Sequence, residues 1–147
     1  CYGVILRPNS DAGGEQIDRV LDDFLSVAKI DKRFCVLKHL ERSEYLTCLA
    51  NCDVIIGNSS SGIIESASFG LACINIGDRQ RGRLRNENVV DCPQVSIDAI
   101  AEAFDRALNL YPPFVNQYGD GKTAERISAI LPKLRLTEEV LSKYNSY

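Results

Sequence analysis

The sequence has 147 residues, of which 45% are hydrophobic and 25% are charged, and its formal net charge is −3. These values are typical of a globular protein and predict a single domain over residues 1–147. The acidic balance argues against a nucleic-acid partner. No apolar stretch approaches the ~20 residues that span a bilayer and no signal-peptide pattern occurs, so no membrane association is expected.

The cysteines are scattered, without a CxxC pair or a His/Cys cluster. Buried, reduced thiols are therefore expected, and they predict a cytoplasmic protein. Cys48 and Cys52 share a predicted helix face, but two soft ligands do not make a metal site. His39 is the only histidine and is interpreted as structural. The sequence predicts neither a metal nor a cofactor.

Short apolar runs alternate with amphipathic segments along the chain. The apolar runs predict strands over Val4–Leu6, Phe34–Leu37, Val54–Ile56, Ala72–Ile76 and Asn88–Asp91. Helical spacing of apolar residues predicts helices over Ile17–Ala28, Tyr45–Ala50, Ile63–Phe69, Ile97–Leu108 and Ala124–Leu131, with a further one near Val140 and Leu141. Ser43 is the predicted N-cap of the second helix, and Gly70 is the predicted C-cap of the third.

Strands that are apolar throughout, each followed by a helix, indicate a parallel sheet with helices on both faces. The fold class is therefore α/β and Rossmann-like. In such folds ligands bind beyond the carboxyl ends of the strands. This rule predicts a site along one edge, built from the loops Arg7–Gly14, Gly57–Gly62 and Gly77–Glu87.

The most informative segment is Gly57-Asn58-Ser59-Ser60-Ser61-Gly62, which joins a buried strand to a helix. The first N–H groups of a helix lack intrahelical partners and suit a phosphate. The serine hydroxyls add donors, and the glycines allow close approach of a ligand. A single serine would suffice as a helix cap, so the triplet predicts phosphate binding by Ser59, Ser60, Ser61 and Gly62. No lysine follows the glycines, so this is not a Walker loop.

Two charged side chains complete the predicted site. Glu65 lies one turn into the helix and is predicted to accept the hydroxyls of a ribose, with the acidic half of a capping box as the alternative. The loop 77–83 carries Arg79, Arg81 and Arg83, and Arg79 is the preferred phosphate contact. Arg83 is an alternative brace for the loop.

The remaining polar loops carry weaker predictions. Asn9 and Asp11 are candidate sugar contacts, although Asp11 fits the cap of the next helix equally well. The segment Tyr118-Gly119-Asp120-Gly121 is interpreted as a turn and a helix start.

These pieces together resemble the C-terminal portion of the UDP-N-acetylglucosamine 2-epimerases, in the hydrolysing branch of sialic acid biosynthesis. The similar stretches are residues 8–14, 57–70, 74–83 with Asn88-Val89, and 118–121. The resemblance implies the C-terminal half of a glycosyltransferase-B-type enzyme of two Rossmann-like halves. It assigns Ser59 and Ser60 to the diphosphate of UDP, Glu65 to the ribose and Arg79 to the phosphates.

The resemblance also implies a reaction. Removal of the C2 proton expels UDP from UDP-N-acetylglucosamine, and the unsaturated sugar adds water to give N-acetylmannosamine. The catalytic acid and base would lie outside this sequence, in a missing N-terminal domain of the same polypeptide, so these residues alone are expected to be inactive. The lack of an initiator methionine agrees with a piece of a longer chain.

Several alternatives stay open. A non-hydrolysing 2-epimerase, the donor domain of a UDP-sugar glycosyltransferase and a non-catalytic nucleotide-binding module all share this architecture. The sequence leaves open which UDP-sugar is bound and whether a homo-oligomer forms.

Overall fold

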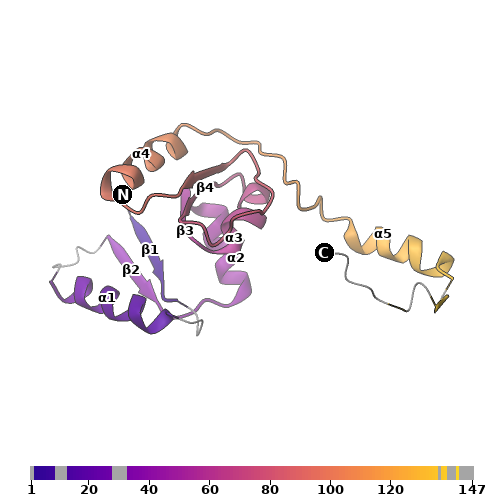
Figure 1. Ribbon diagram of the computed structural model, residues 1–147, viewed down its shortest axis with the longest axis horizontal. Helices are drawn as coiled ribbons and strands as arrows, with labels where there is room; N and C mark the ends of the chain where they lie inside the picture. Colours follow the sequence, from indigo (N-terminus) through magenta and orange to yellow (C-terminus); the bar gives the residue numbers. More distant parts are fainter. Residues whose placement is uncertain (1, 9–12, 28–32, 136, 139–141, 143–147) are drawn as a thin grey trace. The chain divides into compact units, whose positions relative to one another are not determined.

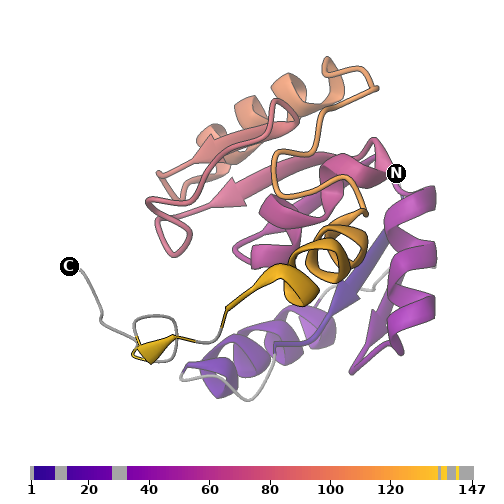
Figure 2. The ribbon, with the colours of Figure 1, turned by 90° about the vertical axis from the view of Figure 1, so that its right-hand side faces the viewer.

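The computed structural model describes residues 2–8, 13–27, 33–135, 137–138 and 142. The chain forms two compact units, Cys1–Asn51 and Cys52–Tyr147. Figures 1 and 2 show the helices and strands of each unit.

The first unit is built on a pair of parallel strands. Strand β1 (Gly3–Leu6) pairs with β2 (Phe34–Leu37), and Gly3 lies opposite Phe34. Helix α1 (Gly14–Val27) connects them, as the apolar spacing predicted. Arg7, just beyond β1, donates to Asp18 (2.9 Å) and Asp22 (2.5 Å) of α1. These hydrogen bonds raise the pKa of the Arg7 guanidinium.

The start of helix α2 (Arg42–Asn51) corrects one prediction. Ser43 is not the N-cap, because the helix begins one residue earlier. The Glu44 carboxylate instead reaches back and accepts the Glu41 N–H at 2.9 Å. This contact is half of a capping box and satisfies a donor that a serine cap would leave unpaired. Leu49 of this helix is buried.

The second unit contains a three-stranded parallel sheet in the order β3-β4-β5. The strands are β3 (Val54–Gly57), β4 (Ala72–Ile76) and β5 (Val89–Cys92). Between β3 and β4 lie the short helix α3 (Ser60–Ile64) and the 3₁₀ helix η1 (Ser66–Phe69). Helix α4 (Ile97–Leu108) follows β5 and is capped by the Ser96 hydroxyl. Helix α5 (Thr123–Ile130) and the 3₁₀ helix η2 (Leu131–Lys133) come last.

Strand β4 is buried on both of its faces. Successive side chains of a strand point to opposite faces. Ala72 and Ile74 belong to a core cluster with α4, whereas Cys73 lies against Gly62 of α3. Figure 2 shows the strands between these two helices. The buried members of the cluster are Ala72, Ile74, Val90, Cys92, Ala103 and Ala107. The α/β class with parallel strands covered by helices is therefore confirmed.

Some element boundaries differ from the prediction. The helix predicted over Ile63–Phe69 starts earlier and is divided at Glu65 into α3 and η1. Gly70 ends η1 with a φ of 65°, the left-handed cap for which a glycine was predicted. Strand β5 lies one residue later than predicted, because the side chain of Asn88 is buried in polar contacts.

The turn at Tyr118–Gly121 leads into α5, as predicted. Asp120 accepts the Lys122 N–H at 3.1 Å and pairs with Arg126 at 2.7 Å. The hydrogen bonds from Arg126 and from the Lys122 backbone lower the pKa of Asp120 to about 2. The helix predicted near Val140 and Leu141 lies outside the described residues.

Two further observations concern expectations from composition. Among the described residues, no helix combines the length and apolar character that a bilayer crossing requires. Of the cysteines that the structure describes, Cys73 and Cys92 are buried as expected, whereas Cys35 and Cys52 are exposed. None of the described cysteines forms a disulfide.

Candidate functional site

The serine turn, residues 57–62, joins β3 to α3. Gly57 ends β3 with a φ of 151°, a conformation that side-chain-bearing residues rarely adopt. This glycine turns the chain toward α3. Ser59 is the N-cap of α3, and its Oγ accepts the Ser61 N–H at 3.3 Å. The capping role that the sequence allowed for one serine thus belongs to Ser59.

The cap uses one backbone donor of the serine turn. A cap satisfies one of the first N–H groups of a helix, and the others have no intrahelical partner. Ser59 is exposed and Ser60 is half-buried. Helix α3 has only 5 residues, so its dipole is small. Anion binding here would depend on local N–H and hydroxyl donors.

Glu65 is held at the junction between α3 and η1. The Ser61 hydroxyl donates to Glu65 Oε2 at 2.7 Å. A capping box requires an acidic residue three positions after the cap. The cap is Ser59, and the third position after it is occupied by Gly62. The capping-box alternative for Glu65 is therefore wrong. Because the Ser61 hydroxyl proton is donated to this carboxylate, Ser61 orients Glu65.

The arginine loop, residues 77–87, follows β4. Because β3 and β4 are parallel neighbours, this loop and the serine turn leave the same edge of the sheet. Arg79 Nη1 lies 3.4 Å from the Asn58 carbonyl, and Gln80 Nε2 donates to the same oxygen at 2.8 Å. The structure thus brings Arg79 to the serine turn.

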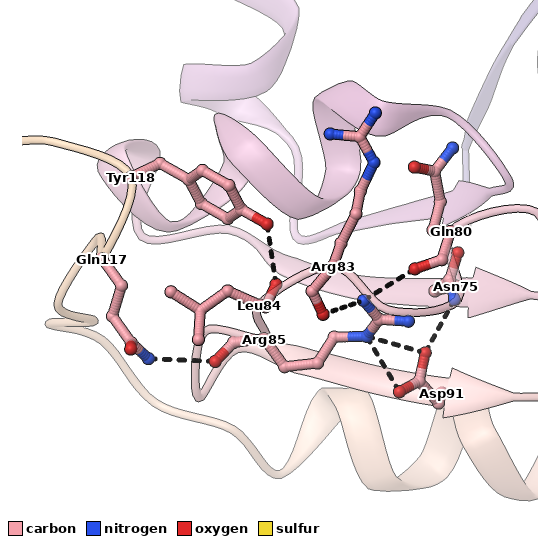
Figure 3. A network of polar contacts seen from close by, with 8 residues as sticks. All are labelled: Asn75, Gln80, Arg83, Leu84, Arg85, Asp91, Gln117 and Tyr118. Carbon is pink, nitrogen blue, oxygen red and sulfur yellow. Dashed lines mark hydrogen bonds and ion pairs between the residues drawn. The ribbon is translucent and has the colours of Figure 1, made fainter. Parts of the chain in front are cut away.

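Arg85 braces the arginine loop against the sheet (Figure 3). Its Nε donates to both carboxylate oxygens of Asp91 at 3.0 and 3.1 Å, and its Nη1 donates to the carbonyls of Gln80 and Arg83. Asn75 of β4 donates to Asp91 at 2.7 Å. Partial burial raises the pKa of Asp91, but the hydrogen bonds from Arg85 and Asn75 outweigh burial and lower it. Arg85, which sequence reasoning missed, therefore fills the bracing role considered for Arg83.

Buried asparagines fix the far end of the loop. Asn86 donates to the Ile63 carbonyl at 3.2 Å, and its side-chain oxygen accepts the Gln117 N–H at 2.9 Å. Asn88 donates to Ser66 Oγ and to the Leu71 carbonyl. The sequence carried one signal for this role, because the polar residues Asn86 and Asn88 stand close to the start of an apolar strand.

Gly62 has a packing role that the sequence did not reveal. It is buried, and a Cβ built on it would lie 2.7 Å from the Sγ of Cys73. Real Cβ atoms do not approach so closely, so a side chain at residue 62 would force either the Cys73 side chain or α3 to shift. Burial also raises the pKa of the Cys73 thiol to about 12, so this sulfur is a packing group.

We expect Gly62→Ala to destabilise the second unit by ~1–3 kcal/mol, because overpacking strains a close-packed contact. The strain should be relieved when the sulfur is removed in Gly62→Ala/Cys73→Ala. Native-state hydrogen exchange of β4 amides in both single variants and the double variant gives the coupling energy. Strictly additive losses would contradict the close contact between α3 and β4.

The remaining site predictions have mixed outcomes. Asn9 and Asp11 lie outside the described residues. The loop Arg7–Gly14 belongs to the first unit, and the other two loops belong to the second. A common edge for all three therefore stays a prediction. Within the described ranges, no three His, Cys, Asp or Glu side chains gather as a metal site would require.

Together, the parallel sheet, the serine turn and the arginine loop define a Rossmann-like α/β protein with polar loops at the carboxyl ends of its strands. The chain matches the sequence profile of the UDP-N-acetylglucosamine 2-epimerase family over residues 2–132. It belongs to this family, as the sequence predicted.

Three named relatives are similar to the chain. It is 44% identical over 145 residues to the UDP-N,N'-diacetylbacillosamine 2-epimerase (hydrolyzing) of Legionella pneumophila, covering 98% of this chain and 37% of the relative. It is 36% identical over 103 residues to the GDP/UDP-N,N'-diacetylbacillosamine 2-epimerase (hydrolyzing) of Campylobacter jejuni, covering 70% and 26% of the two chains. It is 38% identical over 90 residues to the polysialic acid biosynthesis protein P7 of Escherichia coli, covering 61% and 22%. The chain thus spans little more than a third of the Legionella protein.

Proposed function

We propose that the chain forms the UDP-binding domain, over residues 1–147, of a hydrolysing 2-epimerase that acts on a UDP-activated acetamido sugar. The observation that carries the proposal is the meeting of Arg79 with the serine turn at the end of neighbouring parallel strands. Membership of the 2-epimerase family supports a UDP-sugar as the ligand. The names of the Legionella and Campylobacter relatives support the hydrolysing outcome.

The diphosphate and the ribose each have a chemical match in the second unit. The diphosphate would accept hydrogen bonds from the hydroxyls of Ser59 and Ser60, from the Gly62 N–H and from Arg79. Glu65, oriented by the Ser61 hydroxyl, would accept hydrogen bonds from the ribose hydroxyls. Asn9 and Asp11 are retained in the proposal as contacts to the sugar.

The proposed chemistry begins with an elimination. A base takes the proton from C2 of the sugar, a C1–C2 double bond forms, and the C1–O bond breaks with its electron pair leaving on UDP. Water then adds, with its hydroxyl at C1 and a proton at C2 on the opposite face. Negative charge grows on the diphosphate as the C1–O bond breaks, so Arg79 and the turn donors would stabilise that transition state. The acid and base belong to a further domain of the polypeptide.

The identity of the sugar in the UDP-sugar substrate is a separate part of the proposal. The family resemblance implied UDP-N-acetylglucosamine, whereas the Legionella and Campylobacter relatives are named for N,N'-diacetylbacillosamine. Their names favour a diacetamido sugar as the substrate. We retain UDP-N-acetylglucosamine as the second candidate because the family is named for it.

The test is incubation of the full-length natural protein with each UDP-sugar in H₂¹⁸O. We expect release of UDP and a free sugar that carries ¹⁸O at C1 and has an inverted C2. Recovery of an epimerised UDP-sugar would show the non-hydrolysing reaction instead. Transfer of the intact sugar to an acceptor would indicate a glycosyltransferase, and UDP binding without turnover would indicate a binding module.

The wider setting is also part of the proposal. We propose that this domain is the C-terminal half of a glycosyltransferase-B-type enzyme and needs the other half for activity. A homo-oligomer is compatible with this arrangement, and a cytoplasmic location agrees with described cysteines that form no disulfide. No cofactor, metal or nucleic acid is required by the proposed chemistry.

A further inference from the structure

Gln80 is an unusual residue in the arginine loop. Its neighbours Arg79 and Arg81 are exposed, but Gln80 is only 4% exposed. Its Oε1 is buried and has no hydrogen-bond partner among the described residues. A buried acceptor without a partner costs folding free energy. An apolar side chain of the same length would avoid this cost.

The other end of the same amide makes a specific contact. Gln80 Nε2 donates to the Asn58 carbonyl at 2.8 Å, which is a shorter contact than the 3.4 Å from Arg79. The amide orientation is determined by this bond, because the reversed amide would place two oxygens against each other. The Gln80 contact therefore links the arginine loop to the residue that precedes Ser59.

The main chain of Gln80 is itself fixed. Its carbonyl accepts from Arg85 Nη1 at 3.0 Å, and Arg85 is paired with Asp91 of β5. A continuous series of contacts thus runs from the sheet through Arg85 and Gln80 to the serine turn. Asn58 is an exposed residue, so water can reach it when the Gln80 amide is removed. The contact with the Asn58 carbonyl is therefore the structural reason for an amide at residue 80.

We propose that Gln80 is a positioning residue for the nucleotide diphosphate, retained at the expense of stability. It holds the Asn58 carbonyl so that the Ser59 and Ser60 donors point to one place before the ligand arrives. Preorganised donors bind an anion more tightly because no ordering is needed on binding. The inference rests on the proposed function, since it requires a diphosphate at the serine turn.

The experiment compares Gln80→Met with Gln117→Met in the full-length protein. Methionine has the length of glutamine but no amide. Gln117 is a matched control, because its Nε2 also donates to a main-chain carbonyl of the loop, that of Arg85 at 2.9 Å. Dissociation constants for UDP and for uridine, together with the Tm, are measured for both variants and the wild type.

For Gln80→Met we expect Kd for UDP to rise about tenfold, which corresponds to ~1.4 kcal/mol. Kd for uridine should be unchanged, and the Tm should equal or exceed that of the wild type. Gln117→Met should leave both dissociation constants unchanged. An unchanged Kd for UDP, equal losses for UDP and uridine, or a lower Tm than wild type in Gln80→Met would each overturn the inference. Failure of the wild type to bind UDP would instead overturn the proposed function.

Discussion

Replacing Arg79 by alanine is expected to weaken UDP binding by ~1.5–3 kcal/mol, the range for a hydrogen bond to a charged group. The guanidinium is exposed and lies at the serine turn, 3.4 Å from the Asn58 carbonyl. Gln80 holds that carbonyl independently at 2.8 Å, so the turn should keep its shape without Arg79. The loss of affinity would then report the phosphate contact itself.

Arg81→Ala is the matched control for Arg79. Arg81 lies in the same loop, is 83% exposed and pairs with Asp78 at 3.5 Å. Calorimetry with UDP, UMP and uridine should give a loss for Arg79→Ala that grows with ligand charge, and little change for Arg81→Ala. Equal losses in the two variants would mean that only the general positive charge of the loop matters. Equal losses for UDP and uridine would remove Arg79 from the phosphate site.

The sequence allowed the elements to be predicted because hydrophobic burial is a local pattern. The run Ala72–Ile76 is buried on both sides and appeared as an uninterrupted apolar strand, with the bounds that the structure has. The spacing of apolar residues likewise placed α4 at Ile97–Leu108. Boundaries were less accurate where side chains compete for backbone groups. Ser43 is a good cap by type, but the Glu44 carboxylate reaches back to the Glu41 N–H.

The site was only partly visible in the sequence. The serine turn and Arg79 stood out because their residue types match the chemistry of a phosphate. Gln80 and Arg85 did not, since their roles depend on contacts with Asn58 and Asp91 that only the folded chain creates. From the sequence, Gly62 was predicted to lack a side chain so that a ligand can approach. The structure gives a second reason, because the Sγ of Cys73 occupies the space where a Cβ would lie. Contacts between distant residues leave no periodic signal.

Replacing Asn88 by alanine is expected to destabilise the second unit by ~2–4 kcal/mol, because a buried hydrogen-bonding group is removed and its partners are left unpaired. Asn88 is fully buried, and its Nδ2 donates to the Leu71 carbonyl at 2.6 Å and to Ser66 Oγ at 2.7 Å. Leu71 is also buried, at 1% exposed, so water cannot readily replace the lost donor. The Asn88 main-chain carbonyl accepts a hydrogen bond from the Cys73 N–H, so Asn88 lies at the junction of η1, β4 and β5.

The control for Asn88 is Asn109→Ala. Asn109 also donates its Nδ2 to a main-chain carbonyl, that of Asp105 at 2.8 Å, but in an exposed position where water can take over. Hydrogen exchange of β4 and β5 amides should accelerate strongly in Asn88→Ala and by less than the equivalent of ~1 kcal/mol in Asn109→Ala. The Oε1 of Gln80 and the Oδ1 of Asn88 both lack a hydrogen-bond partner within the described part of the chain, so the two variants compare two roles of a buried amide. Asn88 should govern stability and Gln80 ligand affinity, and a large stability loss from Gln80→Met with none from Asn88→Ala would reverse that assignment.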